Sequence, residues 1–413
     1  MQDWAGWLLI LFNFSIVLMW KNIRDDTKVV YAIWFCLVLH HAVVFWNVYI
    51  PDAFSFHGDG LYLALLPEPE WIIFNKNGAI SFTHFLGFIY RAFSASFLFG
   101  RELSVLCFVL SCVVLVKLAD LLDMRRFRVG IILIFGLLPS AVTFMSVTLR
   151  EPWEALFFLM SLYCTIRLRN RPGIMNISFL LMSVSCMSIL HHALRYYAVY
   201  LVVICIYWGI FGRKKNVRVA RHVRFLLAGI LIACVVVLTQ KMGWYMSVRD
   251  AIEGATGTRL ALLKYTDVRT NFSFILDTSS IFGIVTTVPM VFIEYMFAPF
   301  PWQIENVKDI IASLESILRF ALLFFAISWW HRSSGEVRSH YSFLLIAVLG
   351  MELVWALGTA NWGTAPRHHV LGYGVIVLLG APGLIVFMRK IHFRIFGQRK
   401  VSGELNEQVR HMS

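Results

Sequence analysis

The sequence predicts an all-α, polytopic transmembrane helical bundle. The chain has 413 residues, of which 59% are hydrophobic and only 15% are charged, and its mean hydropathy is +0.71. Soluble domains average about 45–50% apolar and about 25% charged residues, so the composition indicates an integral membrane protein. The formal net charge of +13 does not indicate nucleic acid as a partner. The basic residues fall in short stretches between apolar runs, as topology determinants do.

Apolar runs of the length needed to cross a membrane, about 20 residues, predict about eleven spans. They lie near 4–20, 29–49, 102–119, 129–148, 152–168, 174–191, 194–212, 223–240, 312–330, 341–359 and 370–388. The first run is too long for a signal peptide and lacks the basic start and the small-residue cleavage site, so it is expected to be a span. A further apolar stretch at 281–298 contains Pro289 and Glu294, and we expect it to be re-entrant or interfacial.

The placement of lysine and arginine in the short loops predicts the orientation. Basic residues follow the first, third, fifth and seventh runs and close the chain. All these loops fall on one side if the N-terminus is outside and the C-terminus is cytoplasmic. Residues 1–400 then form a single transmembrane domain with outer loops near 50–101 and 241–311, and residues 401–413 form a cytoplasmic tail. The cytoplasmic loops are short and carry no Gly-rich phosphate loop, so the chemistry is expected on the outer face.

The sequence predicts no metal ion and no other cofactor. The cysteines within apolar runs are typical of buried small hydrophobes, and no CxxC or Cys/His spacing indicates a metal site; they include Cys107, Cys112, Cys164, Cys186, Cys205 and Cys234. Two adjacent histidines, His191 and His192, cannot share one helix face, and no carboxylate triad follows them in the sequence.

The first candidate constellation is the segment that follows the second apolar run, with Asp52, His57 and Asp59. A carboxylate at the outer end of a span suits a general base that activates a sugar hydroxyl. An ordinary solvated loop carboxylate, or an aspartate that begins a helix, is the alternative.

Charged residues at two further predicted outer tips form the second and third constellations. Arg150 precedes Glu151, and a guanidinium outside the basic loops suits a bidentate grip on a diphosphate. Glu151, before Pro152, equally suits the positive N-terminal end of a helix. At the other tip, Arg195 follows the two adjacent histidines; the aromatics after it fit the interfacial belt of membrane proteins.

The fourth constellation is the last predicted outer loop, where Arg367 and His368 open the final span. Arginines that converge there would stabilise the charge of a departing diphosphate, although Arg367 is equally suited to anchor the span at the interface. Glu352 and Glu294 are costly within apolar surroundings unless paired. We expect them to pair with Arg319 or with the outer arginines.

Taken together, these motifs resemble a known family. The resemblance rests on the Asp/His segment after the second apolar run and on four short motifs. These are Pro-Ser at 139–140, Leu-Arg-Glu-Pro at 149–152, Ala-Pro-Phe-Pro-Trp-Gln at 298–303 and Asn-Trp-Gly-Thr-Ala-Pro-Arg-His-His at 361–369. The chain, from about residue 50 to 388, is similar to bacterial Wzy-type polysaccharide polymerases and to the wider GT-C class of lipid-linked-sugar glycosyltransferases. The resemblance implies a GT-C-like bundle with a catalytic acid on the first large outer loop, here Asp52 or Asp59. The predicted outer loops lack the adjacent acidic pair that some members use with a divalent metal, so a metal-independent mechanism is expected.

The resulting functional prediction is a bacterial inner-membrane glycosyltransferase. It would join oligosaccharide units carried on polyprenyl diphosphate at the periplasmic face, in contact with membrane lipid and with other polysaccharide-assembly proteins. The predicted catalytic residues are Asp52, Asp59 and Glu151, and the predicted substrate-binding residues are His57, Arg150, His191, His192, Arg195, Trp302, Gln303, Arg367 and His368. A transporter or flippase of lipid-linked glycan is the alternative function, and a non-catalytic assembly scaffold is a third.

Overall fold

The computed structural model describes residues 3–50, 80–170, 173–190 and 269–396, together with residues 201, 257 and 259. Within these residues the chain is helical and carries no strand; an isolated bridge joins Asn271 to Asn361. The helices are α1 Trp4–Ile16, η1 Val17–Met19, α2 Lys21–Arg24, α3 Thr27–Tyr49, α6 Ile80–Ala92, α7 Phe97–Leu121, η2 Arg125–Phe127, α8 Arg128–Leu137, α9 Pro139–Phe144, α10 Glu151–Asn170, α11 Ile174–Leu190, α15 Ile281–Phe297, η4 Pro301–Gln303, α16 Val307–Arg332, α17 Gly335–Gly358 and α18 Ala365–Phe396. The predicted all-α class is confirmed for this part of the chain.

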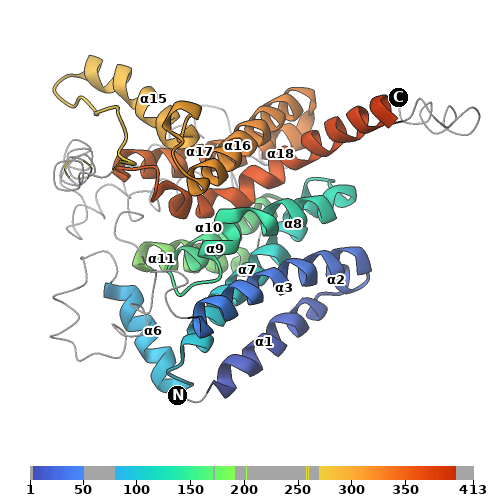
Figure 1. The fold of residues 1–413 in the computed structure, drawn as a ribbon. Helices are drawn as coiled ribbons and strands as arrows, with labels where there is room; N and C mark the ends of the chain where they lie inside the picture. Colours follow the sequence, from blue (N-terminus) through green and yellow to red (C-terminus); the bar gives the residue numbers. More distant parts are fainter. Residues whose placement is uncertain are drawn as a thin grey trace, which may run out of the picture.

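The long helices run back and forth between two ends of the bundle (Figure 1). Helix α18 packs against α16, α17, α10 and α8, while α7 packs against α1, α3 and α10. One end, which we call the basic end, holds the turns that join α1 to α3, α7 to α8 and α16 to α17, and also the C-terminal ends of α10 and α18. The opposite end, which we call the site end, is where α7, α10, α16 and α18 begin.

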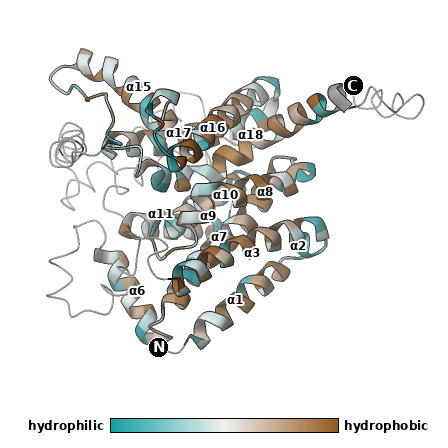
Figure 2. Cartoon of the chain, in the orientation of Figure 1, coloured by the Kyte–Doolittle hydropathy of each residue, from teal (hydrophilic) through white to brown (hydrophobic). Residues whose placement is uncertain are grey.

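The composition of the helices identifies a membrane protein. Five helices of the described chain are long and apolar enough to cross a membrane: Thr27–Tyr49, Phe97–Leu121, Val307–Arg332, Gly335–Gly358 and Ala365–Phe393. Hydrophobic residues dominate the length of these helices, and hydrophilic residues gather at many of the turns (Figure 2). The outer face of α16 leaves large apolar side chains uncovered, including Leu314, Ile317 and Phe320. Such a continuous apolar face suits contact with lipid.

The predicted spans and the observed helices differ in several places. The run 129–148 is two short helices, α8 and α9, because Pro139 lacks the backbone N–H that would continue α8. The run 152–168 lies within α10, whose ends carry four charged residues, Glu151, Glu154, Arg167 and Arg169. The runs 194–212 and 223–240 lie outside the described residues. The count of about eleven spans therefore stays a prediction.

The two predicted outer loops contain helices of their own. Residues 80–92 of the first form α6, and α7 already begins at Phe97. In the second, the apolar stretch at 281–298 forms the single helix α15, which keeps Pro289 inside it. Helix α16 then begins at Val307, where the Asn306 side chain accepts a hydrogen bond from the backbone N–H of Asp309. The predicted tail, residues 401–413, lies outside the described residues.

Basic residues gather at the basic end, as the sequence predicts for the short loops. Arg128 joins three elements there, because its guanidinium donates to Asp120 at the end of α7 and lies 3.6 Å from Asp26 before α3. Arg169 at the end of α10 donates to Ser339 of α17 at 3.0 Å. The basic residues of these turns and helix ends are Lys21, Arg24, Lys28, Lys117, Arg125, Arg126, Arg128, Arg167, Arg169, Arg332, Arg338, Arg389, Lys390 and Arg394.

A glycine permits the close approach of α16 and α18. A Cβ atom built on Gly380 would overlap the backbone carbonyl of Leu322 on α16. Close backbone approach through small residues is a common way for helices to pack within a membrane. The helix that carries Arg367 and His368 is thereby held against α16.

Candidate functional site

The site end of α10 carries the charged turn that the sequence singles out. Arg150 precedes the helix and its carbonyl oxygen accepts the backbone N–H of Glu154 at 3.0 Å, which closes the first helical turn. Glu151 and Glu154 stand three residues apart in this turn, so they lie on the same helix face. Acidic side chains are favoured here because the unsatisfied N–H groups make a helix N-terminus electropositive.

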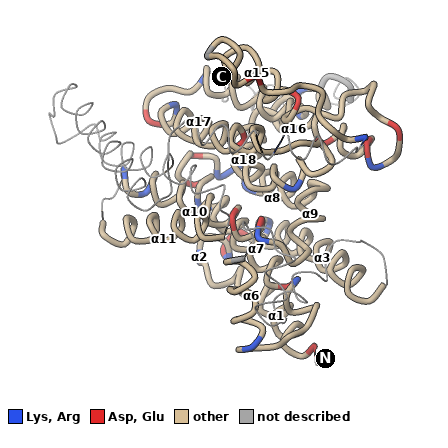
Figure 3. Tube along the Cα trace, turned by 90° about the vertical axis from the view of Figure 1, so that its left-hand side faces the viewer, with Lys and Arg blue, Asp and Glu red and all other residues tan. Residues whose placement is uncertain are grey.

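Arg367 of α18 reaches the same point from a segment 216 residues away in the sequence. Its Nε donates to Glu151 Oε1 at 2.7 Å. Arg150 Nε lies 3.5 Å from that same oxygen and 3.7 Å from Glu154 Oε1. We call Arg150, Glu151, Glu154 and Arg367 the Arg–Glu cluster. Viewed from the site end, acidic and basic residues occur among the helices in the middle of the bundle as well as at its rim (Figure 3).

Burial divides the Arg–Glu cluster into an inner and an outer part. The side chains of Glu151 and Glu154 are 0% exposed, whereas those of Arg150 and Arg367 are 15% and 27% exposed. Among the described residues, none donates a hydrogen bond to Oε2 of Glu151 or to either carboxylate oxygen of Glu154. The accessible part of the cluster is therefore guanidinium, the group best suited to bind a phosphate or carboxylate in a bidentate manner.

His368, next to Arg367, is held by α17. Its ring stacks on Trp355 with centroids 4.0 Å apart, and its Nδ1 lies 2.8 Å from Thr359 Oγ1. The Thr359 hydroxyl donates its own proton to the carbonyl of Trp355 at 2.7 Å. His368 Nδ1 is therefore the donor to Thr359, which leaves Nε2 of a neutral ring as the acceptor atom.

His369 turns in another direction, into the interior of the bundle. Its Nδ1 lies 2.7 Å from Glu352 Oε2, and its Nε2 lies 2.8 Å from a guanidinium nitrogen of Arg319. Because the guanidinium can only donate, Nε2 accepts and the Nδ1–H donates to Glu352. The sequence predicts that Glu352 pairs with Arg319 or with the outer arginines; in the structure its partner is His369, which lies between Glu352 and Arg319.

The polar chain continues across the bundle from Arg319. This guanidinium also donates to Tyr373 of α18 and to the carbonyl of Met296 on α15. One helical turn before Arg319 on α16, Glu315 accepts hydrogen bonds from the backbone N–H and hydroxyl of Ser140, the former at 3.1 Å. Hydrogen-bond partners of this kind lower the free-energy cost of burying ionisable groups in a membrane protein.

Of the remaining predicted residues, Trp302 and Gln303 are described by the structure and are not part of the Arg–Glu cluster. The side chain of Gln303 caps its own short helix, because its Oε1 accepts the backbone N–H of Phe300 at 2.8 Å. Trp302 stacks on Phe300 and is 80% exposed. The sequence predicts that Glu294 pairs with Arg319 or with the outer arginines; it accepts the backbone N–H groups of Ser273 and Phe274, at 2.6 and 3.0 Å, and lies close enough to Arg259 for electrostatic attraction. Asp52, His57, Asp59, His191, His192 and Arg195 lie outside the described residues.

Sequence reasoning missed two groups of buried polar residues. Glu154 is one, although its spacing from Glu151 is a signal that was present. The other joins three helices near the site end, where Glu102 of α7 accepts from Asn13 of α1 at 3.0 Å and lies 2.9 Å from His41 Nδ1 of α3. Beside it, Ser146 Oγ lies 2.9 Å from His40 Nδ1. These side chains sit inside apolar runs, which gave no reason to pair them.

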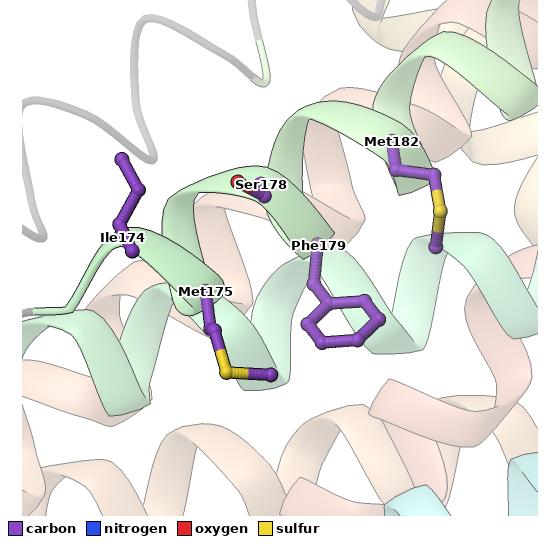
Figure 4. A pocket seen from close by; sticks show the side chains of 5 residues that line it. All are labelled: Ile174, Met175, Ser178, Phe179 and Met182. Carbon is purple, nitrogen blue, oxygen red and sulfur yellow. The ribbon is translucent and has the colours of Figure 1, made fainter.

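A pocket on α11 has a different character from the Arg–Glu cluster (Figure 4). It has a volume of about 260 Å³ and is lined by Ile174, Met175, Ser178, Phe179 and Met182. None of these side chains is ionisable, so the pocket contributes no acid–base or anion-binding chemistry.

No group of three histidine, cysteine, aspartate or glutamate side chains in the described part of the chain is arranged to hold a metal ion. Four cysteines, Cys36, Cys107, Cys112 and Cys164, are buried as free thiols and Cys186 is half-buried. The predicted role of Cys107, Cys112 and Cys164 as buried small side chains is confirmed.

Comparison with known proteins gives no family for this chain. No protein-family model matches the sequence, and no curated protein is significantly similar to it. Function must therefore be argued from the site.

Proposed function

We propose that this chain is an inner-membrane glycosyltransferase of the polymerase type, which joins oligosaccharide units carried on polyprenyl diphosphate at the periplasmic face. The observation that carries the proposal is the convergence of Arg150 and Arg367 on Glu151, with the guanidinium groups as the accessible part of the cluster. Two arginines that come from distant segments and share one carboxylate form a site for a polyanion, and not merely two separate interfacial anchors.

The reaction needs such a site because its leaving group is a diphosphate. The acceptor hydroxyl oxygen attacks the anomeric carbon of the donor sugar, and the bond from that carbon to the diphosphate oxygen breaks. The electron pair leaves with the polyprenyl diphosphate, whose added negative charge Arg150 and Arg367 stabilise. The hydroxyl proton passes to a carboxylate base, for which Asp52 or Asp59 is proposed.

The depth of the cluster along the bundle supports the proposal. Helix α10 has 20 residues, which at about 1.5 Å per residue gives a length of about 30 Å. This is close to the thickness of the hydrocarbon core, about 30 Å. Helix α10 is not among the five helices apolar enough to cross a membrane by composition, but we propose that it spans with the others; with Arg167 and Arg169 at one boundary, Arg150 and Glu151 would then lie at the level of the opposite lipid headgroups. A lipid-linked diphosphate occupies that level while its tail stays among the spans.

The gathering of basic turns at one end supports the proposed orientation. Lysine and arginine in short loops favour the cytoplasmic side, so we place the basic end in the cytoplasm and the site end outside. In this orientation the N-terminus is outside and the C-terminus is cytoplasmic, and the total of about eleven spans belongs to the same proposal.

Polymerisation of lipid-linked repeat units in membrane vesicles tests the proposal. Arg150→Ala and Arg367→Ala are each expected to lower the rate of chain extension by at least about a hundredfold, the effect of removing a preorganised charge-stabilising group. Arg24→Ala, an exposed arginine at the basic end, is the matched control and should retain the wild-type rate. Wild-type extension by both cluster variants would overturn the assignment. Cells that lack the gene should also lose the ladder of surface glycan.

A transporter of the same lipid-linked glycan is the second candidate. The buried chain of Glu352, His369 and Arg319 favours it, since ionisable groups inside a membrane bundle are typical of proton paths. Proteoliposomes that move lipid-linked glycan across the bilayer without forming any new glycosidic bond would favour the transporter over the polymerase.

A further inference from the structure

The Arg–Glu cluster as described carries no surplus positive charge when all its groups are ionised. Arg150 and Arg367 each contribute one positive charge, because a guanidinium does not deprotonate in proteins. Glu151 and Glu154 each contribute one negative charge in the ionised form. An incoming diphosphate therefore meets four groups whose charges sum to zero. Its two negative charges would be bound more tightly by a site with a net positive charge.

The two carboxylates of the cluster differ in how well their charges are compensated. Glu151 accepts a hydrogen bond from Arg367 at 2.7 Å and has Arg150 at 3.5 Å. Glu154 accepts no hydrogen bond from the residues that the structure describes, and it has Arg150 as its ion-pair partner at 3.7 Å. Both side chains are fully buried, and a buried charge without hydrogen bonds is costly. Glu154 is therefore the group whose charge is the easier to remove.

An anion bound to the guanidinium groups makes this difference larger. It competes with Glu154 for Arg150 and adds negative charge beside a buried carboxylate, and a nearby like charge disfavours the ionised form. The two equilibria are therefore linked. If anion binding favours the protonated form of Glu154, then protonation of Glu154 tightens anion binding by the same factor.

We propose that binding of a diphosphate headgroup at the Arg–Glu cluster is coupled to the uptake of one proton, and that Glu154 is the group that takes it up. The inference rests on the proposed function, because it assumes that the cluster binds a diphosphate. It adds a reason for the presence of a second, hydrogen-bond-free carboxylate in the cluster. With Glu154 ionised, the four charges of the free cluster balance; with Glu154 protonated, Arg150, Arg367 and Glu151 together leave one net positive charge for the bound headgroup.

The charged and titratable groups that face Glu154 from the described elements are few. Arg150 and Glu151 come from the start of α10 and Arg367 comes from α18. His368 of α18 adjoins Arg367 and is already committed to Thr359 and Trp355. A proton taken up on binding thus has Glu154 as its main acceptor in this part of the chain.

Isothermal titration calorimetry of the purified full chain in lipid nanodiscs tests the inference. The probe is a water-soluble P1,P2-disubstituted diphosphate, which carries two negative charges throughout the pH range used and takes up no proton itself. Titration in buffers of different ionisation enthalpy gives the number of protons bound, which for the wild type is expected to approach one at pH values high enough to ionise Glu154 in the free protein. The Kd should rise by up to about tenfold per pH unit as the pH increases, the limit set by a single linked proton.

The isosteric variant Glu154→Gln separates the inference from the proposed function. It mimics the protonated form, so it should bind the probe at least as tightly as the wild type, without proton uptake and with a Kd independent of pH. Glu305→Gln, an exposed acidic residue at the same end, is the control and should keep the proton uptake. Wild-type binding without proton uptake, or unchanged uptake in Glu154→Gln, would overturn the inference and leave the proposed function standing. Failure of the wild type to bind the probe at any pH would overturn both.

Discussion

Removal of Arg367 should leave the buried Glu151 carboxylate without its closest positive charge and lower the stability of the fold. A second substitution, at Glu151, should restore part of that stability. The Arg367 guanidinium donates to Glu151 Oε1 at 2.7 Å, and Glu151 is 0% exposed. Two unit charges at that separation attract by roughly 6 kcal/mol at an effective dielectric constant of about 20. Desolvation of the two groups and the partial exposure of Arg367 offset much of this attraction, and Arg150 at 3.5 Å compensates part of the remaining charge. We therefore expect Arg367→Ala to lower the free energy of unfolding by about 2–4 kcal/mol.

The double variant Arg367→Ala/Glu151→Gln gives the sharper result. Neutralising Glu151 removes the stranded charge, so the double variant should be more stable than Arg367→Ala alone, with a coupling energy of about 2 kcal/mol. Denaturant titration in mixed micelles, followed by tryptophan fluorescence, measures all four proteins of the cycle. The pair Arg367→Ala/Glu305→Gln is the control and should be additive, because Glu305 lies in the ion pair with Arg269 and outside the cluster. If the Arg367/Glu151 cycle is also additive to within about 0.5 kcal/mol, the contact does not stabilise the protein and the description of the cluster is wrong.

Three further substitutions test the fold around the site. Gly380→Ala should lower Tm markedly in thermal unfolding, because its Cβ would overlap the Leu322 carbonyl; Gly358→Ala, with open space around the same atom, should leave Tm unchanged or slightly raised. Asn306→Ala should cost about 1 kcal/mol in denaturant titration through loss of the cap of α16, and Asn306→Asp should restore most of it. Glu352→Ala should cost about 3–5 kcal/mol because it removes one partner of a buried pair, and Glu352→Gln, which keeps a hydrogen-bond acceptor, should cost clearly less; equal costs for these two variants would contradict the assigned hydrogen bond.

Much of the fold could be predicted because a membrane span depends on local properties. The length and hydropathy of a run are visible in a window of about 20 residues, and five such runs are helices of spanning length in the described chain. The break before α9 was also visible, since Pro139 lies within the run 129–148. The hydropathy of this run nevertheless predicts one span, because hydropathy does not register the loss of one backbone N–H donor.

The candidate site could be predicted only in part. Arg150 and Arg367 were found because charged residues at predicted outer tips are conspicuous, and loop parity puts them at the same end. Their contact with one oxygen of Glu151 depends on the rotation of α10 and α18 about their own axes. That rotation is fixed by packing along the whole length of each helix, which no local pattern contains.

The buried partners were beyond prediction for a related reason. Glu352 could be expected to be paired, but the choice of His369 as its partner follows from the crossing of α17 and α18 and from the small volume of Gly372. A Cβ atom at Gly372 would overlap the Glu352 carboxylate. Only the three-dimensional arrangement reveals that this glycine makes room for an acid.

Three consecutive residues at the start of α18 each contact a different neighbour. Arg367 faces α10, His368 faces the aromatic ring of Trp355, and His369 faces the acid of α17. Successive residues of a helix are turned by about 100° from one another, so a shift of the sequence by a single position would break all three contacts together. The Arg-His-His tripeptide should accordingly behave as one unit in a saturation mutagenesis screen. Its members should tolerate few replacements, whereas the nearby exposed Thr364 should accept many.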